Sequence, residues 1–193
     1  MRKIQCLLLM VLAVLLFSGC SCKKDNDSIE YTHYLRGGGK EKLKAKILWE
    51  YSNSTFTKYQ VAYTSYVCSD PSVNYMNVIY LEITNKGSKD EAIVRNISFS
   101  TLEENNTIFN VGLWGDYKEA IGKEYYSGIE SELLSKIKYS NYDFISAIAK
   151  NGYRNYEKIE GINADAIAGG TISASNIVSI VKAVFDYHLD TQY

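Results

Sequence analysis

The chain has 193 residues, with 21 lysines and arginines against 22 aspartates and glutamates and a formal net charge of −1. This length supports one domain with a substantial hydrophobic core rather than two typical domains. The balanced charge, without a visible basic stripe, argues against nucleic acid as a partner.

Residues 1–19 have the features of a targeting signal rather than of a folded element. Arg2 and Lys3 give a positive start, residues 4–17 form an apolar core, and small residues precede Cys20. The apolar run is short for a membrane span, which needs about 20 residues. The pattern resembles a bacterial lipoprotein signal, in which Cys20 becomes the lipidated N-terminus after cleavage; a plain secretory signal or a membrane anchor is the alternative. The mature chain is therefore expected at a cell membrane, lipid-anchored on the extracytoplasmic face.

Residues 20–40 are expected to be a lipidated tether and linker, and residues 41–193 to form the domain. The linker is polar and charged, and the glycines at 37–39 give it a flexible break. Cys22 and Cys68 could pair in an oxidising compartment. The sequence does not fix their geometry, so it does not decide whether they form a disulfide.

The histidines and cysteines do not have the spacing of metal ligands, so the sequence predicts no metal site. His33 and His188 are isolated in the sequence, and both are expected at the surface or at a helix end. A tethered hydrolase is the least favoured function, because neither histidine has a recognisable nucleophile motif nearby.

The middle of the chain predicts one helix followed by strands. Leu43, Ile47 and Leu48 have helical spacing, which predicts a short helix over residues 40–52. Alternating aromatic and β-branched residues then predict strands over 56–67, 73–84 and 92–99, separated by turns at 69–72 and 85–88.

The second half predicts helices at residues 127–138, 143–150 and 175–189, with part of 153–162 extended. Together these elements predict an α+β fold. We expect a single domain, mainly an antiparallel sheet packed against helices, with the C-terminal helix following a Gly-Gly-Thr turn.

That turn lies in the stretch most suggestive of function, residues 165–175. Gly169 and Gly170 would let the backbone approach a ligand closely, and free N–H groups at the helix start could bind an anion such as phosphate. The plainer alternative is an ordinary turn in which Ser173 or Ser175 caps the helix.

The same stretch resembles the signature of the FMN-binding domain family, Asp-x-x-(Ser/Thr)-Gly-Ala-(Thr/Ser)-x-(Thr/Ser). That family includes the flavin-bearing subunits of Na+-translocating NADH:quinone reductase and Rnf complexes, and extracytoplasmic flavinylated lipoproteins. The chain matches at four positions and departs from the signature at Ala168 and Gly170. The matching residues are Asp165, Gly169, Thr171 and Ser173.

The resemblance implies that Thr171 carries FMN through a phosphoester, made from FAD by a separate, metal-dependent flavin transferase. It also implies that Asp165 fixes the loop or assists the transferase. The residues expected around the cofactor are Gly169, Gly170, Ile172, Ser173, Asp165 and Trp114. Trp114, which lies between two glycines, is expected either to lie against the flavin ring or to pack in the core.

The sequence thus supports two functions. The first is a membrane-anchored extracytoplasmic electron-transfer protein with covalent FMN, a redox carrier rather than a stand-alone catalyst. Its partners would be membrane lipid through Cys20, the flavin transferase, and a membrane or extracellular redox protein. The alternative, favoured by Ala168 and Gly170, is a lipoprotein that keeps the fold, has lost flavin and acts as a binding or structural module. The 17 tyrosines could also form a carbohydrate-binding surface, although strand packing explains them more simply.

Overall fold

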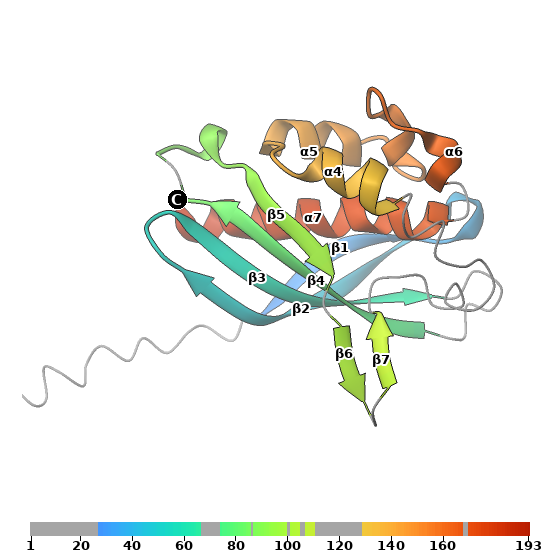
Figure 1. Ribbon diagram of the computed structural model, residues 1–193, viewed down its shortest axis with the longest axis horizontal. Coiled ribbons are helices and arrows are strands. Elements are labelled where there is room, and N and C mark those ends of the chain that lie inside the picture. Colours follow the sequence, from blue (N-terminus) through green and yellow to red (C-terminus); the bar gives the residue numbers. More distant parts are fainter. Residues whose placement is uncertain are drawn as a thin grey trace, which may run out of the picture.

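The computed structural model describes residues 27–66, 74–85, 87–99, 101–104, 107–110, 129–167 and 170–193. These residues form an α+β fold, in which helices lie on one side of an antiparallel sheet (Figure 1). The predicted fold class is confirmed. Among the described residues, no helix has both the length and the apolar character needed to cross a membrane.

The main sheet is a meander of five strands in the order β1-β2-β3-β4-β5, and each neighbouring pair is antiparallel. Its strands are β1 (Ser28–Tyr34), β2 (Lys40–Ser52), β3 (Phe56–Tyr66), β4 (Asn74–Thr84) and β5 (Val94–Phe99). Strands β6 (Thr101–Glu104) and β7 (Thr107–Asn110) form a separate hairpin. The three strands predicted over 56–67, 73–84 and 92–99 are confirmed as β3, β4 and β5.

The helical side is built by α4 (Ser135–Ile137), α5 (Tyr142–Ala149), α6 (Ala164–Ile167) and the long α7 (Thr171–Gln192). The helix predicted over 127–138 is a π-helix at Ile129–Leu134 continued by α4; residues 127 and 128 lie outside the described part. The extended segment predicted within 153–162 is wrong, because the 3-10 helix η4 (Asn155–Lys158) occupies it. The last helix begins at Thr171, four residues earlier than predicted.

The linker prediction is wrong for residues 28–40, because β1 occupies Ser28–Tyr34 and a short 3-10 helix leads into β2. Within β1, the residues Ile29, Tyr31 and His33 alternate inward and are buried. The glycines at 37 and 38 have φ values of 81° and 89°, so they supply the left-handed conformation of the β1–β2 turn. The folded part therefore begins before residue 41, where the domain was expected to start.

The helix predicted over residues 40–52 is also wrong, because this segment is strand β2. Its apolar residues fit both periods: Leu43 and Ile47 are spaced as in a helix, but Leu43, Ala45 and Ile47 also alternate as in a strand. Pairing with β1 on one side and β3 on the other satisfies the backbone of this segment and decides in favour of the strand.

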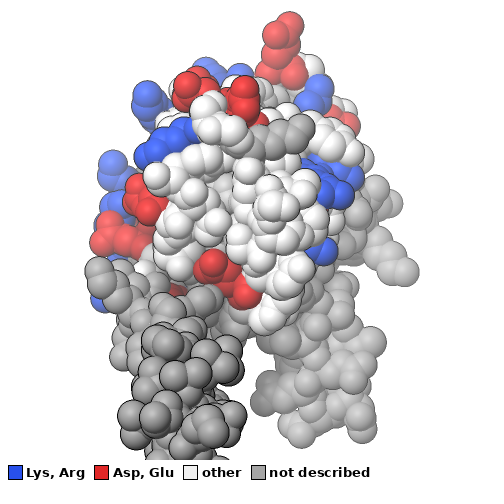
Figure 2. Space-filling view, turned by 90° about the vertical axis from the view of Figure 1, so that its left-hand side faces the viewer, with Lys and Arg blue, Asp and Glu red and all other residues white. Residues whose placement is uncertain are grey.

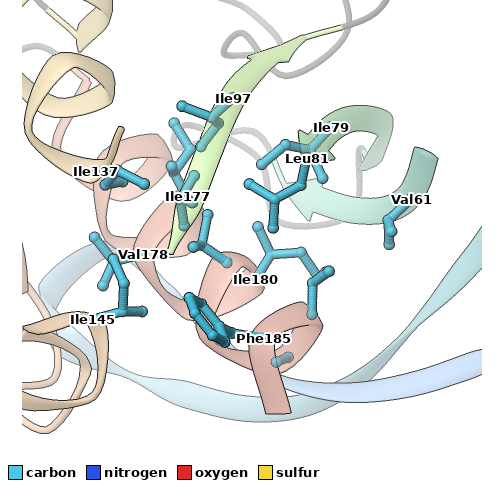
Figure 3. Close-up of a cluster of buried hydrophobic side chains, with 14 of the residues drawn as sticks. Val61, Ile79, Leu81, Ile97, Ile137, Ile145, Ile177, Val178, Ile180 and Phe185 are labelled. Atoms are coloured by element: carbon cyan, nitrogen blue, oxygen red, sulfur yellow. The ribbon is translucent and has the colours of Figure 1, made fainter. Parts of the chain in front are cut away.

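The core lies between the inner face of the sheet and α7, with α4 and α5 closing its side (Figure 3). Figure 3 shows sheet and helix side chains converging on one apolar layer: Val61, Ile79, Leu81, Ile97, Ile137, Ile145, Ile177, Val178, Ile180 and Phe185. The Phe185 side chain has no exposed surface. Burying a side chain of this size stabilises the fold by roughly 1.5–3 kcal/mol relative to leaving it in water.

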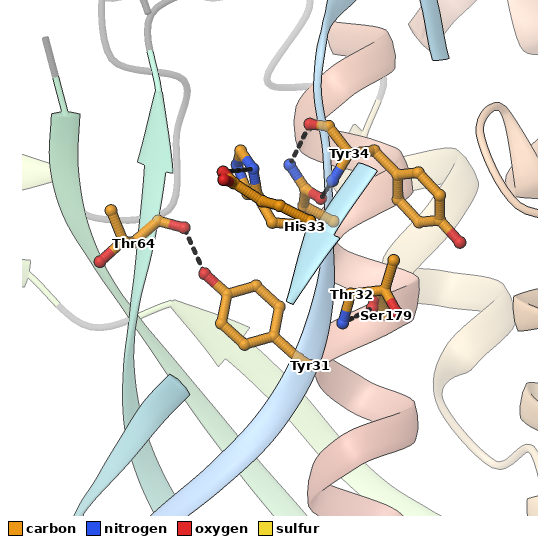
Figure 4. Close-up of polar contacts among 8 residues, drawn as sticks. Tyr31, Thr32, His33, Tyr34, Thr64 and Ser179 are labelled. Carbon is orange, nitrogen blue, oxygen red and sulfur yellow. Dashed lines mark hydrogen bonds and ion pairs between the residues drawn. The ribbon is translucent and has the colours of Figure 1, made fainter. Parts of the chain in front are cut away.

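Polar side chains of α7 hold the edge strand β1. Asn176 accepts a hydrogen bond from the backbone N–H of Tyr34 at 2.7 Å and donates to the Tyr34 carbonyl at 3.2 Å. The Ser179 hydroxyl accepts from the N–H of Thr32 at 3.1 Å (Figure 4). An edge strand exposes unpaired backbone groups, and here the helix satisfies several of them. These bonds explain why Asn176 and Ser179 are buried on an otherwise apolar helix face.

Candidate functional site

Thr171 is the first residue of α7, the longest helix that the structure describes. Its side chain is half-buried, and Gly170 before it is the N-cap residue. The N–H groups in the first turn of any helix lack intrahelical partners, and a glycine N-cap has no side chain to satisfy them. The start of α7 therefore presents a hydroxyl beside backbone donors and the positive end of the helix dipole.

Three consecutive residues at the start of the 3-10 helix η4 hold this helix start in place. The Arg154 backbone N–H donates to the Ser175 hydroxyl at 3.0 Å, and the Asn155 side chain donates to the Ser175 carbonyl at 3.2 Å. The Tyr156 hydroxyl donates to Oγ1 of Thr171 at 3.1 Å. Asn155 and Tyr156 are fully buried. The segment 154–156 thus fixes both the first turn of α7 and the Thr171 hydroxyl.

The backbone of Arg154 is strained, because its φ of 60° puts a non-glycine residue in the left-handed region. This conformation aims the Arg154 N–H at the Ser175 hydroxyl, which itself donates to the Thr171 carbonyl at 2.7 Å. The strain is thus offset by hydrogen bonds that converge on the candidate site.

Tyr156→Phe tests whether Tyr156 positions the Thr171 hydroxyl. The change keeps the buried ring and removes only the hydroxyl bond, so we expect a loss of about 0.5–1.5 kcal/mol in unfolding free energy. If the bond orients the acceptor, the rate of flavin attachment to Thr171 should fall several-fold while its final extent is retained. Intact mass followed over time, together with thermal unfolding, measures both effects. An unchanged attachment rate would limit Tyr156 to a packing role.

Gly170 is explained by packing rather than by backbone conformation. Its φ of −99° is available to any residue, but a Cβ at this position would lie 2.6 Å from Cδ1 of Ile129. Ile129 is buried, so its side chain has little room to move. In this chain, Ile129 fills the space that the alanine of the family signature would need.

Gly170→Ala should therefore lower the unfolding free energy by about 1–3 kcal/mol through overpacking. Ile129→Val removes the clashing Cδ1 atom and by itself should cost about 0.5–1.5 kcal/mol. The double variant should be more stable than the sum of the two losses predicts, because the added methyl group fills the vacated space. A double-mutant cycle by chemical denaturation measures this coupling, and strict additivity would contradict the packing explanation.

The structure brings only some of the predicted site residues together. Ile172 is buried against the core, whereas Asp165 is exposed in the first turn of α6. Ser173 is half-buried, and two helical positions from Thr171 turn its side chain by roughly 200° about the helix axis. Any contact of Ser173 with a group held on Thr171 would thus come from its backbone N–H. Cys20, Trp114, Ala168, Gly169, Cys22 and Cys68 lie outside the described residues.

Both histidine side chains are fully buried. The expectation of a surface position or a helix end is therefore wrong for His33, which lies within β1, whereas His188 does lie near a helix end. His188 lies near the end of α7 and contacts the Tyr59 hydroxyl and the Thr84 carbonyl. His33 faces Glu41 across the β1–β2 pair, with Nδ1 3.3 Å from the carboxylate, and burial lowers the pKa of His33 while Glu41 opposes that shift. Neither histidine lies in the first turn of α7.

The described residues could hold a phosphate group, but they do not suggest a metal site. The N–H groups of a helix start and the helix dipole favour an anion at the start of α7, next to the Thr171 hydroxyl. Within the described ranges, no group of three or more histidine, cysteine, aspartate or glutamate side chains could bind a metal ion.

Comparison with known proteins does not identify relatives: no protein-family model, no curated protein and no solved structure matches the chain.

Proposed function

We propose that this protein is a membrane-anchored extracytoplasmic electron carrier that holds FMN as a phosphoester of Thr171. The observation that carries the proposal is the place of Thr171 in the fold. Thr171 is the first residue of a 22-residue helix, and its hydroxyl lies beside first-turn amides that suit a phosphate. The Asp-x-x-x-Gly-x-Thr-x-Ser pattern of residues 165–173 points to the same residue.

In the proposed attachment, the Thr171 oxygen bonds to the flavin-side phosphorus of FAD. The pyrophosphate bond of FAD breaks, AMP leaves, and the hydroxyl loses its proton to the transferase. Tyr156 would orient the acceptor oxygen, and the first-turn amides would hold the phosphate afterwards. The bound flavin would supply the redox chemistry, and the protein its attachment and orientation.

The packing of Gly170 against Ile129 supports this proposal, because it removes one argument against it. The glycine departs from the family signature, and that departure favoured a protein that has lost flavin. Here the space for the usual methyl group is occupied by a buried side chain, so the departure has a local steric cause. Gly170 therefore gives no reason to infer loss of the cofactor.

The alternative, a flavin-free binding or structural module, is favoured by one observation. The Thr171 hydroxyl already has a partner in the buried Tyr156, and the Thr171 side chain is half-buried. A hydroxyl in this setting also makes sense as a structural contact that stabilises the start of α7.

Intact mass of the mature protein separates the two functions. The chain is produced with and without a flavin transferase that is known to be active on a control protein. A mass increase equal to one FMN phosphoester, accompanied by flavin absorbance, is expected only with the transferase. A folded chain that gains no mass beside a modified control protein would leave the flavin-free module as the better description.

A further inference from the structure

The outer face of β2 carries a row of lysines that continues into exposed apolar side chains. Lys40, Lys42, Lys44 and Lys46 alternate along the strand and are all exposed, whereas Ala45 and Ile47 point into the core. The pairing of β2 with β3 shows that the row continues beyond Lys46. Lys46, Trp49 and Tyr51 stand opposite the outward residues Ala62, Gln60 and Lys58.

A β-bulge between Ile47 and Trp49 produces the apolar end of this face. The bulge leaves Leu48 45% exposed, next to Trp49 at 47% and Tyr51 at 48%. The rings of Trp49 and Tyr51 are nearly parallel, with centroids 6.1 Å apart and an interplanar angle of 8°. Three large apolar side chains at about half exposure form a patch of the kind that marks an interaction surface.

The chain leading to the predicted lipid anchor enters the sheet beside this patch. The Asp27 carbonyl accepts a hydrogen bond from the N–H of Ile47 at 2.6 Å, and Ser28 pairs with Lys46. Strand β1 therefore begins at the junction between the lysine row and the apolar patch. From residue 20 to Asp27 the chain can span at most roughly 25 Å, so a lipid attached at Cys20 would keep the patch near the bilayer.

We propose that this outer face of β2 docks on an anionic lipid surface. Lysines near an anionic bilayer each contribute about 1 kcal/mol of attraction, and the described partners of this row neutralise little of its charge. Lys42 is paired with Glu30 at 3.2 Å, but Lys40, Lys44 and Lys46 remain exposed around that pair. Tryptophan and tyrosine suit the boundary between headgroups and acyl chains, because their rings are both apolar and polar.

The surroundings of the patch fit a local contact rather than insertion of a whole face. Two further cations, Lys58 and Arg95, lie over the Phe56 ring, but both pair with Glu82. At the end of the molecule that carries the C-terminus, uncharged surface is bordered by both cationic and acidic side chains (Figure 2). The β2 row is therefore distinguished by having four lysines on one face of one strand, because the protein as a whole has a net charge of only −1.

Docking in this way would turn the helical side of the sheet away from the lipid. Helix α7 packs on the face of the sheet opposite the lysine row, and Thr171 lies at the end of α7 away from the start of β1 (Figure 1). Tyr187, 16 residues after Thr171 in α7, donates to Glu50 of β2, so the helix rise puts Thr171 about 24 Å along α7 from the part of β2 that carries the patch. This consequence rests on the proposed function, and the nearness of the patch to the bilayer rests on the proposed lipid anchor, but the charge and exposure of the β2 face depend on neither.

Vesicle binding tests the docking surface without flavin. The chain of residues 20–193 with Cys20→Ser keeps every described element and lacks the lipid. It should bind phosphatidylcholine vesicles containing about 30 mol % phosphatidylglycerol, bind vesicles of phosphatidylcholine alone much less, and dissociate as salt is raised. In a Trp114→Phe background, Trp49 is the sole tryptophan, and its emission should shift to shorter wavelength on binding.

Two charge reversals provide the matched comparison. Lys44→Glu/Lys46→Glu should weaken binding at least roughly tenfold, because two attractive charges become repulsive. Lys150→Glu/Lys158→Glu makes the same change in net charge at exposed positions outside the sheet and should bind nearly as well as the parent chain. Trp49→Ser should weaken binding and abolish the emission shift.

Equal weakening by both charge reversals, or equal binding to neutral and anionic vesicles, would overturn the proposal. An apolar patch that served as a dimer interface instead would give a dimer in sedimentation velocity, lost in Trp49→Ser, and no vesicle binding. If the Lys44→Glu/Lys46→Glu variant does not fold, the salt dependence and the Trp49 emission of the parent chain decide the question.

Discussion

Replacing Thr171 by alanine should abolish covalent flavin attachment completely, whereas Thr171→Ser should retain it. Alanine lacks the only atom that can form the phosphoester, and serine keeps a hydroxyl at the same place in the helix start. Ser173→Ala is the matched control, because it removes a neighbouring hydroxyl that lies roughly 200° around the helix from Thr171. Intact mass of the three variants, each produced with the transferase, measures the outcome.

The fold must be shown to survive these changes. Thr171→Ala also removes the acceptor of the Tyr156 hydroxyl, and leaving that buried group unpaired should lower the unfolding free energy by about 1–3 kcal/mol. Circular dichroism and thermal unfolding establish that the variant remains folded. Flavin retained on a folded Thr171→Ala protein would place the attachment elsewhere, and flavin lost in Ser173→Ala would transfer the acceptor role to Ser173.

The fold class was predictable because most elements have one clear hydrophobic period. In β3, the residues Thr57, Tyr59 and Val61 are buried, while Lys58 and Gln60 between them are half-exposed. In α7, which the sequence predicts as a helix over residues 175–189, apolar residues at helical spacing are buried: Ile177, Val178, Val181, Val184, Phe185 and Leu189. A regular spacing of apolar residues can be detected in the sequence without knowing what those residues pack against.

β2 shows why other elements could not be predicted. Its apolar positions satisfy both a helical and an extended period, and pairing with strands on both sides decides between them. The error also concealed the lysine row. On a helix these lysines would spread around the axis, whereas on a strand they all share one face. One wrong assignment of secondary structure thus hid a candidate interaction surface.

The surroundings of Thr171 depend on contacts that sequence patterns do not contain. The short 3-10 helix that holds the start of α7 has no hydrophobic periodicity, so Asn155 and Tyr156 gave no signal before the fold was known. The reason for Gly170 lies in Ile129, far away in the chain. The motif points to Thr171 as the proposed acceptor, but only tertiary packing explains how its hydroxyl and the neighbouring glycine are held.

The buried His188 should make the protein sensitive to acid. Its Nε2 lies 3.2 Å from the Thr84 carbonyl, which only accepts, so Nε2 carries the proton. Nδ1 then accepts from the Tyr59 hydroxyl at 2.9 Å. Burial raises the pKa of Tyr59, so this hydroxyl keeps its proton over the working pH range. A second proton on the imidazole would place a positive charge in this buried site and break the present hydrogen bond from Tyr59.

This burial lowers the pKa of His188 from 6.5 to about 4. Between these pH values the unfolded chain binds a proton that the folded protein does not, so stability increases with pH. The contribution is fully present above about pH 6.5 and is lost as the pH falls toward 4. A shift of this size corresponds to about 3 kcal/mol of unfolding free energy.

Chemical denaturation at pH 7 and at pH 4 should show this loss, and His188→Gln should reduce it. Glutamine does not titrate, so the variant should be less stable at pH 7, because the buried hydrogen bonds are disturbed, but should lose about 3 kcal/mol less than the parent on acidification. Carboxylates titrate in both proteins and cancel in this difference. His33, whose pKa burial also lowers, gives an internal comparison: because Glu41 opposes that shift, His33→Gln should change the acid sensitivity less than His188→Gln does. If His188→Gln and its parent lose equal stability, the neutral imidazole between Tyr59 and Thr84 cannot be the source of the acid sensitivity.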